Sequence, residues 1–452
     1  MGPRLVHYSD VENAYDDPDR IGRLASTLDA STGPDSLLVG TGDNTAPGVL
    51  SLVTNGRQAL DLFSAVEPDF ETFGNHDFDH GLDATRDVVE ASPQTWLTAN
   101  VRNGDGRFLA DETAQWAVRE VAGTRIGFVG VTAPETGAAS PAAEPLTFTD
   151  PFDAVAGAEA ALRNAGAEYV VVLSHLGRAD DDLARRSDVD VILGGHVHQR
   201  RIERVDGTLL ARPGSNGHTV VTVALDGAEP TAEFKTVDDA APDERVTGAI
   251  EDRLAETGLD EIVATVEEPI SRERMDTYGG ESRIGNFVAD AYRWAMDTDV
   301  GLQNGGGVRE DETPLSGDVT VADLVSVVPF EEPVVVAEVS GAELRTLCRQ
   351  ASGRVVPYGE PDWWNAHLSG LEVVWDRESR TVERLHVGGE PVDPETTYTV
   401  ATTDYLLHTP VEFPVLTGTH RVDVGALQYE VLAEYARAEG IDPSVTGRVV
   451  RR

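Results

Sequence analysis

Short apolar segments alternate with amphipathic segments through the first half of the chain. Residues 36–40 are apolar enough for a buried strand, whereas residues 18–30 place apolar side chains at helical spacing. Further strands are predicted at 5–10, 65–73, 94–100, 125–132, 169–174 and 189–195, and further helices at 51–65 and 150–165. Strands and helices that alternate in this way predict a layered α/β fold.

Polar residues follow the predicted strands at the point where each strand ends. They are Asp10, Glu12, Asp43, Asn75, His76, His175, His196 and His198. Active sites of layered α/β folds usually lie at this edge of the sheet. A single Asp after a strand is more often a turn residue or a helix cap, and a single His there is usually a polar group with its hydrogen bonds satisfied. The prediction of a functional site therefore depends on the ordered set.

The same residue types suit a centre with two divalent metal ions. Two ions about 3.5–4 Å apart require a bridging carboxylate and a mixed shell of oxygen and nitrogen ligands. Asp43 can bridge, and the other ligands divide into two groups: Asp10, Glu12 and His198 for one ion, and Asn75, His175 and His196 for the other. The sequence therefore predicts a metal site that is suited to phosphoryl chemistry.

The chain carries 79 acidic and 36 basic residues, which gives a formal net charge of −43 at pH 7. No basic stripe offsets repulsion by phosphates, so a nucleic-acid duplex is not expected as a partner. We interpret the composition as adaptation to molar salt, where a Debye length of about 3 Å would screen the self-repulsion. The alternative interpretation is an ordinary acidic protein.

No apolar run in the sequence reaches the roughly 18 residues that a membrane span needs, and the N-terminal residues lack the apolar segment of a secretory signal. We therefore expect a cytoplasmic protein without a membrane partner. Cys348 is the only cysteine, which excludes an intramolecular disulfide and a cysteine metal cluster. We expect it to pack in a helix at 342–350.

Apolar content drops around residues 237–244, where a proline and an acidic run occur. We therefore place the first domain at 1–240, a linker helix at 241–260 and a second domain at 261–452. In the second domain, the glycines of segment 303–309 allow close approach of a ligand to the backbone. In isolation, such a segment would more often be a plain glycine turn.

Together, these motifs resemble the 5′-nucleotidase family of calcineurin-like metallophosphoesterases. The matching segments are 10–12, 42–44, 74–79, 174–175, 195–198, 280–291 and 303–309, so the resemblance covers nearly the whole chain. It implies an α/β (α+β) protein with an N-terminal four-layer α/β/β/α metallophosphatase sandwich and a C-terminal α/β nucleotide-binding domain. It also implies the two metal sites with the ligands given above.

The resemblance implies that His76 and Asp79 form a catalytic dyad. His76 would stabilise transition-state charge or protonate the leaving alkoxide, and Asp79 would orient the imidazole. One departure is that the family's first motif is normally Asp-x-His, whereas Glu12 stands at its third position here. Because a carboxylate is a harder ligand, we expect Mn²⁺ to be favoured, with Zn²⁺, Co²⁺ or Mg²⁺ as alternatives. The alternative is that Glu12 does not bind a metal ion and that the first metal site is weak or empty.

The resemblance also implies a nucleotide as the small-molecule substrate. It assigns Asn304 and Arg309 to contacts with the nucleotide. It assigns Phe330 and Tyr405 to stacking of the base, which could contribute about 1–3 kcal/mol to binding.

Two expected substrate contacts of the family are missing here. An acidic glycine-rich loop whose Asp contacts the ribose does not follow Tyr405, and Glu412 is a candidate replacement. A phosphate-side Arg of the family is Tyr278 in this chain, and Arg283 is a candidate to compensate. The identity of the substrate is therefore less firmly predicted than the reaction type.

We predict a dinuclear-metal phosphoesterase that hydrolyses nucleoside 5′-monophosphates to nucleoside and phosphate. A 2′,3′-cyclic nucleotide phosphodiesterase or a nucleoside-diphosphate-sugar hydrolase would use the same metals and stays an alternative. A nucleotide-binding protein with impaired catalysis is an alternative from a different class, although the retained His76 and Asp79 argue against it. Members of the family are often exported, so an extracytoplasmic location is open by analogy.

Overall fold

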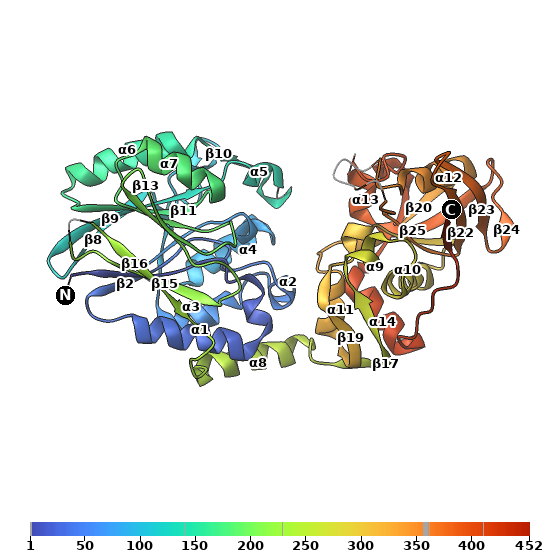
Figure 1. Ribbon diagram of the computed structural model, residues 1–452, viewed down its shortest axis with the longest axis horizontal. Helices are drawn as coiled ribbons and strands as arrows, with labels where there is room; N and C mark the ends of the chain where they lie inside the picture. The colour runs from blue at the N-terminus through green and yellow to red at the C-terminus, as the bar shows by residue number, and fades with distance from the viewer. Residues whose placement is uncertain (1, 140, 228, 356–359, 361, 410) are drawn as a thin grey trace. The chain divides into compact units, whose positions relative to one another are not determined.

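The computed structural model describes residues 2–139, 141–227, 229–355, 360, 362–409 and 411–452. The chain folds into two compact units, the first ending at Thr257 and the second beginning at Gly258 (Figure 1). Each unit has its own sheets and its own hydrophobic core. Within the described residues, no helix is both long and apolar enough to cross a membrane.

The first unit contains two large mixed sheets and one small one. One large sheet consists, in spatial order, of β16 (Thr231–Thr236), β15 (Thr219–Ala224), β1 (Arg4–Tyr8), β2 (Ser36–Gly40), β3 (Phe70–Thr72), β4 (Thr95–Leu97) and β7 (Thr113–Ala114). The other consists of β13 (Arg201–Val205), β14 (Thr208–Arg212), β12 (Val191–Gly194), β11 (Tyr169–His175), β9 (Thr124–Thr132) and β8 (Trp116–Val121). The small sheet consists of β10 (Leu146–Phe148), β5 (Val101–Asn103) and β6 (Gly106–Arg107).

Four layers make up this unit. Apolar side chains such as Val39 and Phe70 from one large sheet and Phe128 and Leu173 from the other form the central core. A second core lies between the other face of β9, β11 and β12 and the helices α6 (Pro151–Asn164) and α7 (Asp180–Arg186). The helices α1 (Pro18–Ser31), α3 (Ala59–Val66) and α8 (Glu244–Thr257) cover the opposite side (Figure 1). The predicted helix–sheet–sheet–helix arrangement is confirmed.

The predicted single helix at 51–65 is wrong. The chain forms two helices here, α2 (Val49–Thr54) and α3, because Asn55 and Gly56 adopt left-handed backbone angles with φ of 53° and 78°. Asn and Gly tolerate this conformation, and it ends a helix. The predicted strand at 94–100 is shorter than expected and ends at Leu97 in β4. The next helix is α4 (Leu82–Ala91), and α8 packs against α1 within the first unit.

The second unit has a five-stranded sheet, a four-stranded sheet and an antiparallel pair. The first consists, in spatial order, of β21 (His367–Ser369), β18 (Val300–Gln303), β25 (Thr397–Thr403), β20 (Pro333–Ser340) and β26 (Arg421–Leu427). The second consists of β24 (Glu390–Pro391), β23 (Thr381–Val387), β22 (Leu371–Asp376) and β27 (Val449–Arg451), and the pair of β17 (Ile262–Arg272) and β19 (Asp311–Thr320).

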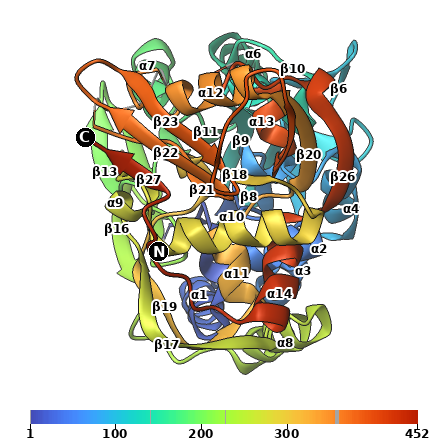
Figure 2. The ribbon, with the colours of Figure 1, turned by 90° about the vertical axis from the view of Figure 1, so that its right-hand side faces the viewer.

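The helices of this unit include α9 (Arg274–Tyr278), α10 (Arg283–Met296), α11 (Val321–Val327), α12 (Gly341–Gln350), α13 (Asp404–His408) and α14 (Gln428–Glu439). The α10 helix packs against β18, β21 and α14 (Figure 2). Cys348 is buried in α12, as predicted, and burial raises the pKa of its thiol to about 12. A thiol in this environment is a packing residue rather than a nucleophile.

Candidate functional site

The predicted metal ligands lie at the ends of β1, β2, β3, β11 and β12 or in the loops that follow these strands. Four of them, Asp10, Glu12, Asp43 and His196, have positive φ angles of 50°, 45°, 52° and 70°. Residues other than glycine rarely adopt this conformation, and such outliers cluster at functional sites. The loops are therefore bent so that these side chains converge at one edge of the sheets.

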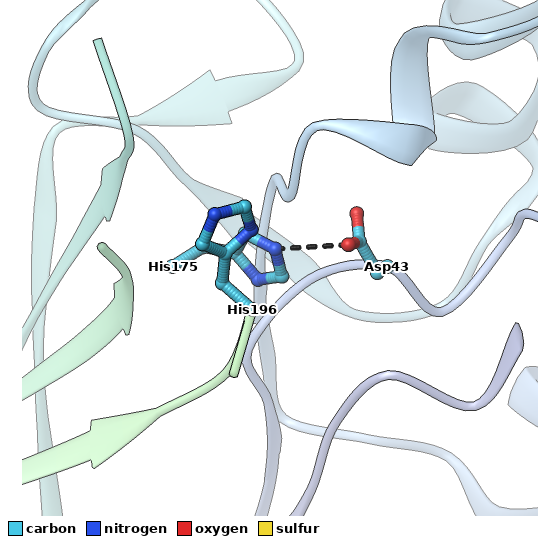
Figure 3. A group of neighbouring side chains, drawn as sticks. All are labelled: Asp43, His175 and His196. Carbon is cyan, nitrogen blue, oxygen red and sulfur yellow. Dashed lines mark hydrogen bonds and ion pairs between the residues drawn. The ribbon is translucent and has the colours of Figure 1, made fainter. Parts of the chain in front are cut away.

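The first ligand group consists of Asp43, His175 and His196, which Figure 3 shows around one point. Their potential ligand atoms all lie within 4.8 Å of one another. The Nε2 atom of His175 is 2.9 Å from Oδ2 of Asp43, and both side chains are buried. Asn75 joins the group, because its Oδ1 lies 2.8 Å from Nδ1 of His196. The structure thus brings together the ligands that the sequence predicts for the second ion, Asn75, His175 and His196, with Asp43.

The other group consists of Asp10, Glu12 and His198. Nε2 of His198 lies 2.9 Å from Oε1 of Glu12 and 3.8 Å from Oδ1 of Asp10. The backbone N–H of His196 donates to Oδ1 of Asp10 at 2.9 Å, so this group adjoins the first. Glu12, which departs from the pattern of the family, lies among the predicted ligands.

The two ligand groups carry buried carboxylates, which suit a site that binds cations. Burial, opposed by His175 and reinforced by Asp43 and Glu12, raises the pKa of Asp10 to about 7. Burial lowers the pKa of His175, but Asp43 outweighs this effect and raises it to about 10. Carboxylates crowded in a buried site repel one another unless cations offset their charge. Carboxylate, imidazole and amide donors fit two divalent ions.

His76 and Asp79 lie beside the first group. Nδ1 of His76 donates to Oδ2 of Asp79 at 2.6 Å, and the His76 backbone N–H donates to Oδ1 of Asp43 at 2.7 Å. Burial lowers the pKa of His76, but Asp79 and Asp43 outweigh this effect and raise it to about 9. With Nδ1 held by Asp79, the Nε2–H of a protonated His76 is the group that can act on a substrate.

Asp77 has a structural role next to the metal ligands. Its buried carboxylate accepts hydrogen bonds from the backbone N–H of Asp43 at 3.0 Å, of Gly74 at 2.7 Å and of Thr45 at 3.2 Å. One side chain therefore joins the loop that carries Asp43 to the loop that begins at Gly74. His80, which is 2.9 Å from Oγ of Ser51, lies in the same segment.

Two further buried acids support the ligand loops and were missed by sequence reasoning. Glu71 accepts from the backbone N–H of Gly42 and the side chain of Asn44. Asp180 forms a buried ion pair with Arg212 at 2.8 Å and accepts from Ser174, the residue before His175, at 2.6 Å. In a chain with 79 acidic residues, no local pattern separates these buried acids from those on the surface.

The second unit contains a cavity of about 380 Å³ that gathers most of the predicted substrate residues. Its lining consists of Tyr278, Gln303, Asn304, Gly306, Gly307, Arg309, Phe330, Glu332, Thr403, Tyr405, Glu412 and Gln428. The guanidinium carbon of Arg309 lies 5.1 Å from the centre of the Phe330 ring. Asn304, Arg309, Phe330 and Tyr405, which come from three separate segments of the chain, thus meet in one place.

Glu412 is buried in this cavity and organises it. Its Oε2 accepts from the side-chain amides of Asn304 at 2.9 Å and Asn365 at 2.7 Å. Its Oε1 accepts from the hydroxyl of Tyr405 at 3.2 Å. The carboxylate therefore connects the glycine-rich segment to the predicted stacking residue.

Arg283 is not among the residues that line the cavity. Its guanidinium donates to the backbone carbonyls of Pro443 at 2.9 Å, Pro269 at 3.1 Å and Glu268 at 3.3 Å. The structure therefore gives Arg283 a part in holding the start of α10, and it does not place this residue where it could compensate for Tyr278. Tyr278 itself lines the cavity and stacks on Trp363, with ring centres 4.1 Å apart.

Comparisons with known proteins agree with this architecture. The profile described as calcineurin-like phosphoesterase matches residues 3–200, and the one described as 5′-nucleotidase, C-terminal domain matches residues 262–418. A solved structure of a 5′-nucleotidase precursor from Thermus thermophilus is similar, with a TM-score of 0.72 and 24% identity over 100% of this chain and 99% of that one. At this identity, the likeness shows the fold.

Two curated relatives have other names. Endonuclease YhcR of Bacillus subtilis (strain 168) is 26% identical over 82% of this chain, but this chain spans only 33% of that protein. An apyrase from Tabanus yao is 24% identical, and the match covers 96% of this chain and 90% of the apyrase. With the two profiles and the ligand geometry, these likenesses show that the chain belongs to the 5′-nucleotidase family of calcineurin-like phosphoesterases.

Proposed function

We propose that this enzyme hydrolyses nucleoside 5′-monophosphates to nucleoside and phosphate. The observation that carries the proposal is the cavity of the second unit, where Phe330 and Tyr405 offer rings and Arg309 a cation. Asn304 and Glu412 add polar groups that can form hydrogen bonds with a sugar. Rings, one cation and buried polar groups are what a nucleoside with a nearby phosphate requires.

The metal centre would be formed by the two ligand groups. Asp10, Glu12 and His198 would hold one divalent ion, and Asp43, Asn75, His175 and His196 the other. When bound, such ions polarise a phosphoryl group and make water more acidic. With three carboxylates in the set and Glu12 among them, Mn²⁺ is our first choice of ion.

His76 would serve the leaving group. Its Nδ1–H is held by Asp79, so the Nε2–H of the imidazolium would donate a proton to the 5′ oxygen as the bond from phosphorus to that oxygen breaks. Water supplies the new oxygen on phosphorus, and the products are a nucleoside with a free 5′ hydroxyl and inorganic phosphate. His76 then regains its proton from solvent, because its side chain is 38% exposed.

Hydrolysis of AMP, 2′,3′-cyclic AMP and UDP-glucose, measured side by side in molar KCl with Mn²⁺, tests this proposal. The products to quantify by chromatography are adenosine from AMP, 2′- or 3′-AMP from the cyclic nucleotide, and UMP from UDP-glucose. The cyclic phosphodiesterase and the nucleotide-sugar hydrolase would use the same ions, so the cavity alone must select the substrate. We expect the largest kcat/KM for AMP. A larger kcat/KM for either of the other substrates would refute the assignment to monophosphates. Nucleotide binding without any hydrolysis would favour the binding protein with impaired catalysis.

A nucleoside di- or triphosphatase is a second candidate, because the relative from Tabanus yao, whose match covers 96% of this chain and 90% of that protein, is named an apyrase. The cavity carries Arg309 together with two carboxylates, Glu332 and Glu412. This charge balance favours a substrate with one phosphate near Arg309 over one that brings further phosphates to the carboxylates. Including ADP and ATP in the same assay separates the two candidates.

A further inference from the structure

We infer that the cavity of the second unit reads the base of its substrate, and that guanine is the base it fits best. Glu332 and Gln428 would supply the contacts. The inference rests on the proposed function, because it concerns which nucleoside 5′-monophosphate the enzyme prefers.

Glu332 and Gln428 lie next to each other at the part of the cavity that holds the two rings. The backbone N–H of Gln428 donates to the carbonyl oxygen of Glu332 at 3.1 Å. The side chain of Glu332 accepts from the backbone N–H of Tyr405 through Oε2 at 3.2 Å. Phe330 precedes Glu332 by two residues, and all four side chains line the cavity. A base between the rings would therefore present its edge to Glu332 and Gln428.

The two side chains offer different hydrogen-bonding groups. Oε1 of Gln428 accepts from the hydroxyl of the buried Tyr292 at 2.6 Å, which leaves the amide N–H groups available to a ligand. Oε1 of Glu332 and the second lone pair of its Oε2 are acceptors. Burial, with the charge of Asp404, raises the pKa of Glu332, so hydrogen-bond donors from a ligand would stabilise its ionised form.

Guanine matches this pair of groups along one edge. Its N1–H and N2–H donors can both face the Glu332 carboxylate, and its O6 acceptor can face the amide of Gln428. Adenine presents an acceptor at N1 and a donor at N6, so each of its groups would meet a group of the same kind. Hypoxanthine keeps O6 and N1–H and lacks the second donor. Because the Glu332 carboxylate would face two adjacent donors, the preference of the cavity should fall from guanine to hypoxanthine to adenine.

The charges of the cavity set the direction in which a nucleotide would lie. Glu332 and Glu412 repel a phosphate, whereas Arg309 attracts it. A nucleotide would therefore place its phosphate near Arg309 and its uncharged base near Glu332. In this orientation, Glu332 contacts the base and not the reacting group.

Hydrolysis of GMP, IMP and AMP by the full chain in molar KCl with Mn²⁺ tests the inference. We expect kcat/KM for GMP to exceed that for AMP by about tenfold or more, which is the usual discrimination of one good bidentate contact. Glu332→Gln should reduce the ratio of GMP to AMP at least severalfold. Glu338→Gln, a matched change on the exposed face of β20, should keep the ratio of the wild type.

Binding of free guanosine and adenosine, measured by calorimetry, reads the cavity without hydrolysis and separates this inference from the proposed function. Tighter binding of guanosine that Glu332→Gln abolishes would support base reading even in a protein that hydrolyses no monophosphate. Equal kcat/KM for GMP and AMP, with equal binding of the two nucleosides, would overturn the inference and leave the proposed function standing. An unchanged GMP to AMP ratio in Glu332→Gln would show that this residue does not read the base.

Discussion

The buried carboxylate of Glu71 accepts a hydrogen bond from the side-chain amide of Asn44 at 3.1 Å. Asn44 follows Asp43, and its Oδ1 accepts from the backbone N–H of Val11, which lies between Asp10 and Glu12 in sequence. Glu71 also accepts from the backbone N–H of Gly42 at 3.2 Å and from the hydroxyl of Tyr8 at 2.8 Å. One side chain in β3 thus supports two of the loops that carry the metal ligands.

Removing the acceptors of Glu71 should weaken both the fold and the metal centre. Glu71→Met would leave the N–H of Gly42, the amide of Asn44 and the hydroxyl of Tyr8 without their partner, and each buried unsatisfied group costs about 1–3 kcal/mol. Glu71→Gln keeps an acceptor oxygen and nearly the same shape. We expect Glu71→Met to lower the melting temperature and the bound metal, and Glu71→Gln to retain both. Normal metal content in a folded Glu71→Met would show that the network does not position the ligands.

The same residue should make stability depend on pH. Burial, reinforced by Asp77 and opposed by hydrogen bonds from Tyr8, Gly42 and Asn44, raises the pKa of Glu71 from its ordinary value of 4.5 to about 8. The folded state therefore keeps this proton to a higher pH than the unfolded state does. The contribution to stability is complete below the unfolded pKa and falls as the pH rises, until it is lost above about 8.

Comparison of wild type with Glu71→Gln isolates this contribution. Gln resembles the neutral carboxyl group and does not ionise. We expect the difference in unfolding free energy, variant minus wild type, to increase between pH 4.5, the ordinary pKa of glutamate, and about pH 8. Above about pH 8 the difference should stay constant. Urea titrations across this range measure the difference. A difference that stays constant with pH would contradict the raised pKa of Glu71.

The sequence could predict the ligands because their positions follow from local patterns. Asp43, His175 and His196 lie at the ends of strands or just past them, and parallel strands bring their carboxyl ends to one edge. Glu71 lies within a strand, and nothing in its neighbourhood distinguishes it from a surface acid. Its role depends on contact with Asn44, which is far away in sequence. Phe70 faces the core between the two large sheets, so Glu71 points to the other face of its own sheet. Its contacts arise only when β1, β2 and β3 pair in that sheet.

Arg283 shows the same limit in the second unit. A cation near a predicted nucleotide motif was a reasonable substitute for the missing Arg, but the side chain points to the carbonyl groups of Pro269 and Pro443. Those carbonyls come from segments before and long after Arg283. Where a long side chain goes depends on such tertiary neighbours. Arg309 follows the glycine turn directly, but its contacts are tertiary too: its backbone N–H donates to the carbonyl oxygen of Val327 at 2.9 Å, and its guanidinium lies over the ring of Phe330.

Loss of His76 should lower turnover without emptying the metal site. General acid catalysis typically contributes about 10²–10⁴-fold, so we expect His76→Ala to lose at least hundredfold in kcat for AMP. Asp79→Asn should lose less, since it keeps a hydrogen-bonding group near Nδ1 and removes the charge. His80→Ala, in the same segment, is the matched control and should retain kcat. Loss of metal along with activity in His76→Ala would assign this residue to metal binding instead.

Glu12→His should change which ion the enzyme prefers. Glu12 lies 2.9 Å from His198, and an imidazole is a softer donor than a carboxylate. We expect wild type to be most active with Mn²⁺ and the variant to shift towards Zn²⁺. Metal content after dialysis against equal concentrations of the two ions, together with hydrolysis of AMP, measures the shift. The same metal content in both proteins would show that Glu12 is not a ligand.

The surface charge should make the fold depend on salt. With 79 acidic against 36 basic residues, acidic groups far outnumber the cations of the chain, so their repulsion destabilises the compact state in dilute buffer. Raising KCl from about 0.1 M to 1 M shortens the Debye length from about 10 Å to 3 Å and should raise the melting temperature. NaCl at the same ionic strength should have the same effect, because screening does not distinguish the two cations. A melting temperature that does not change between these concentrations would support the ordinary acidic protein. A rise with KCl alone would indicate specific binding of potassium rather than screening.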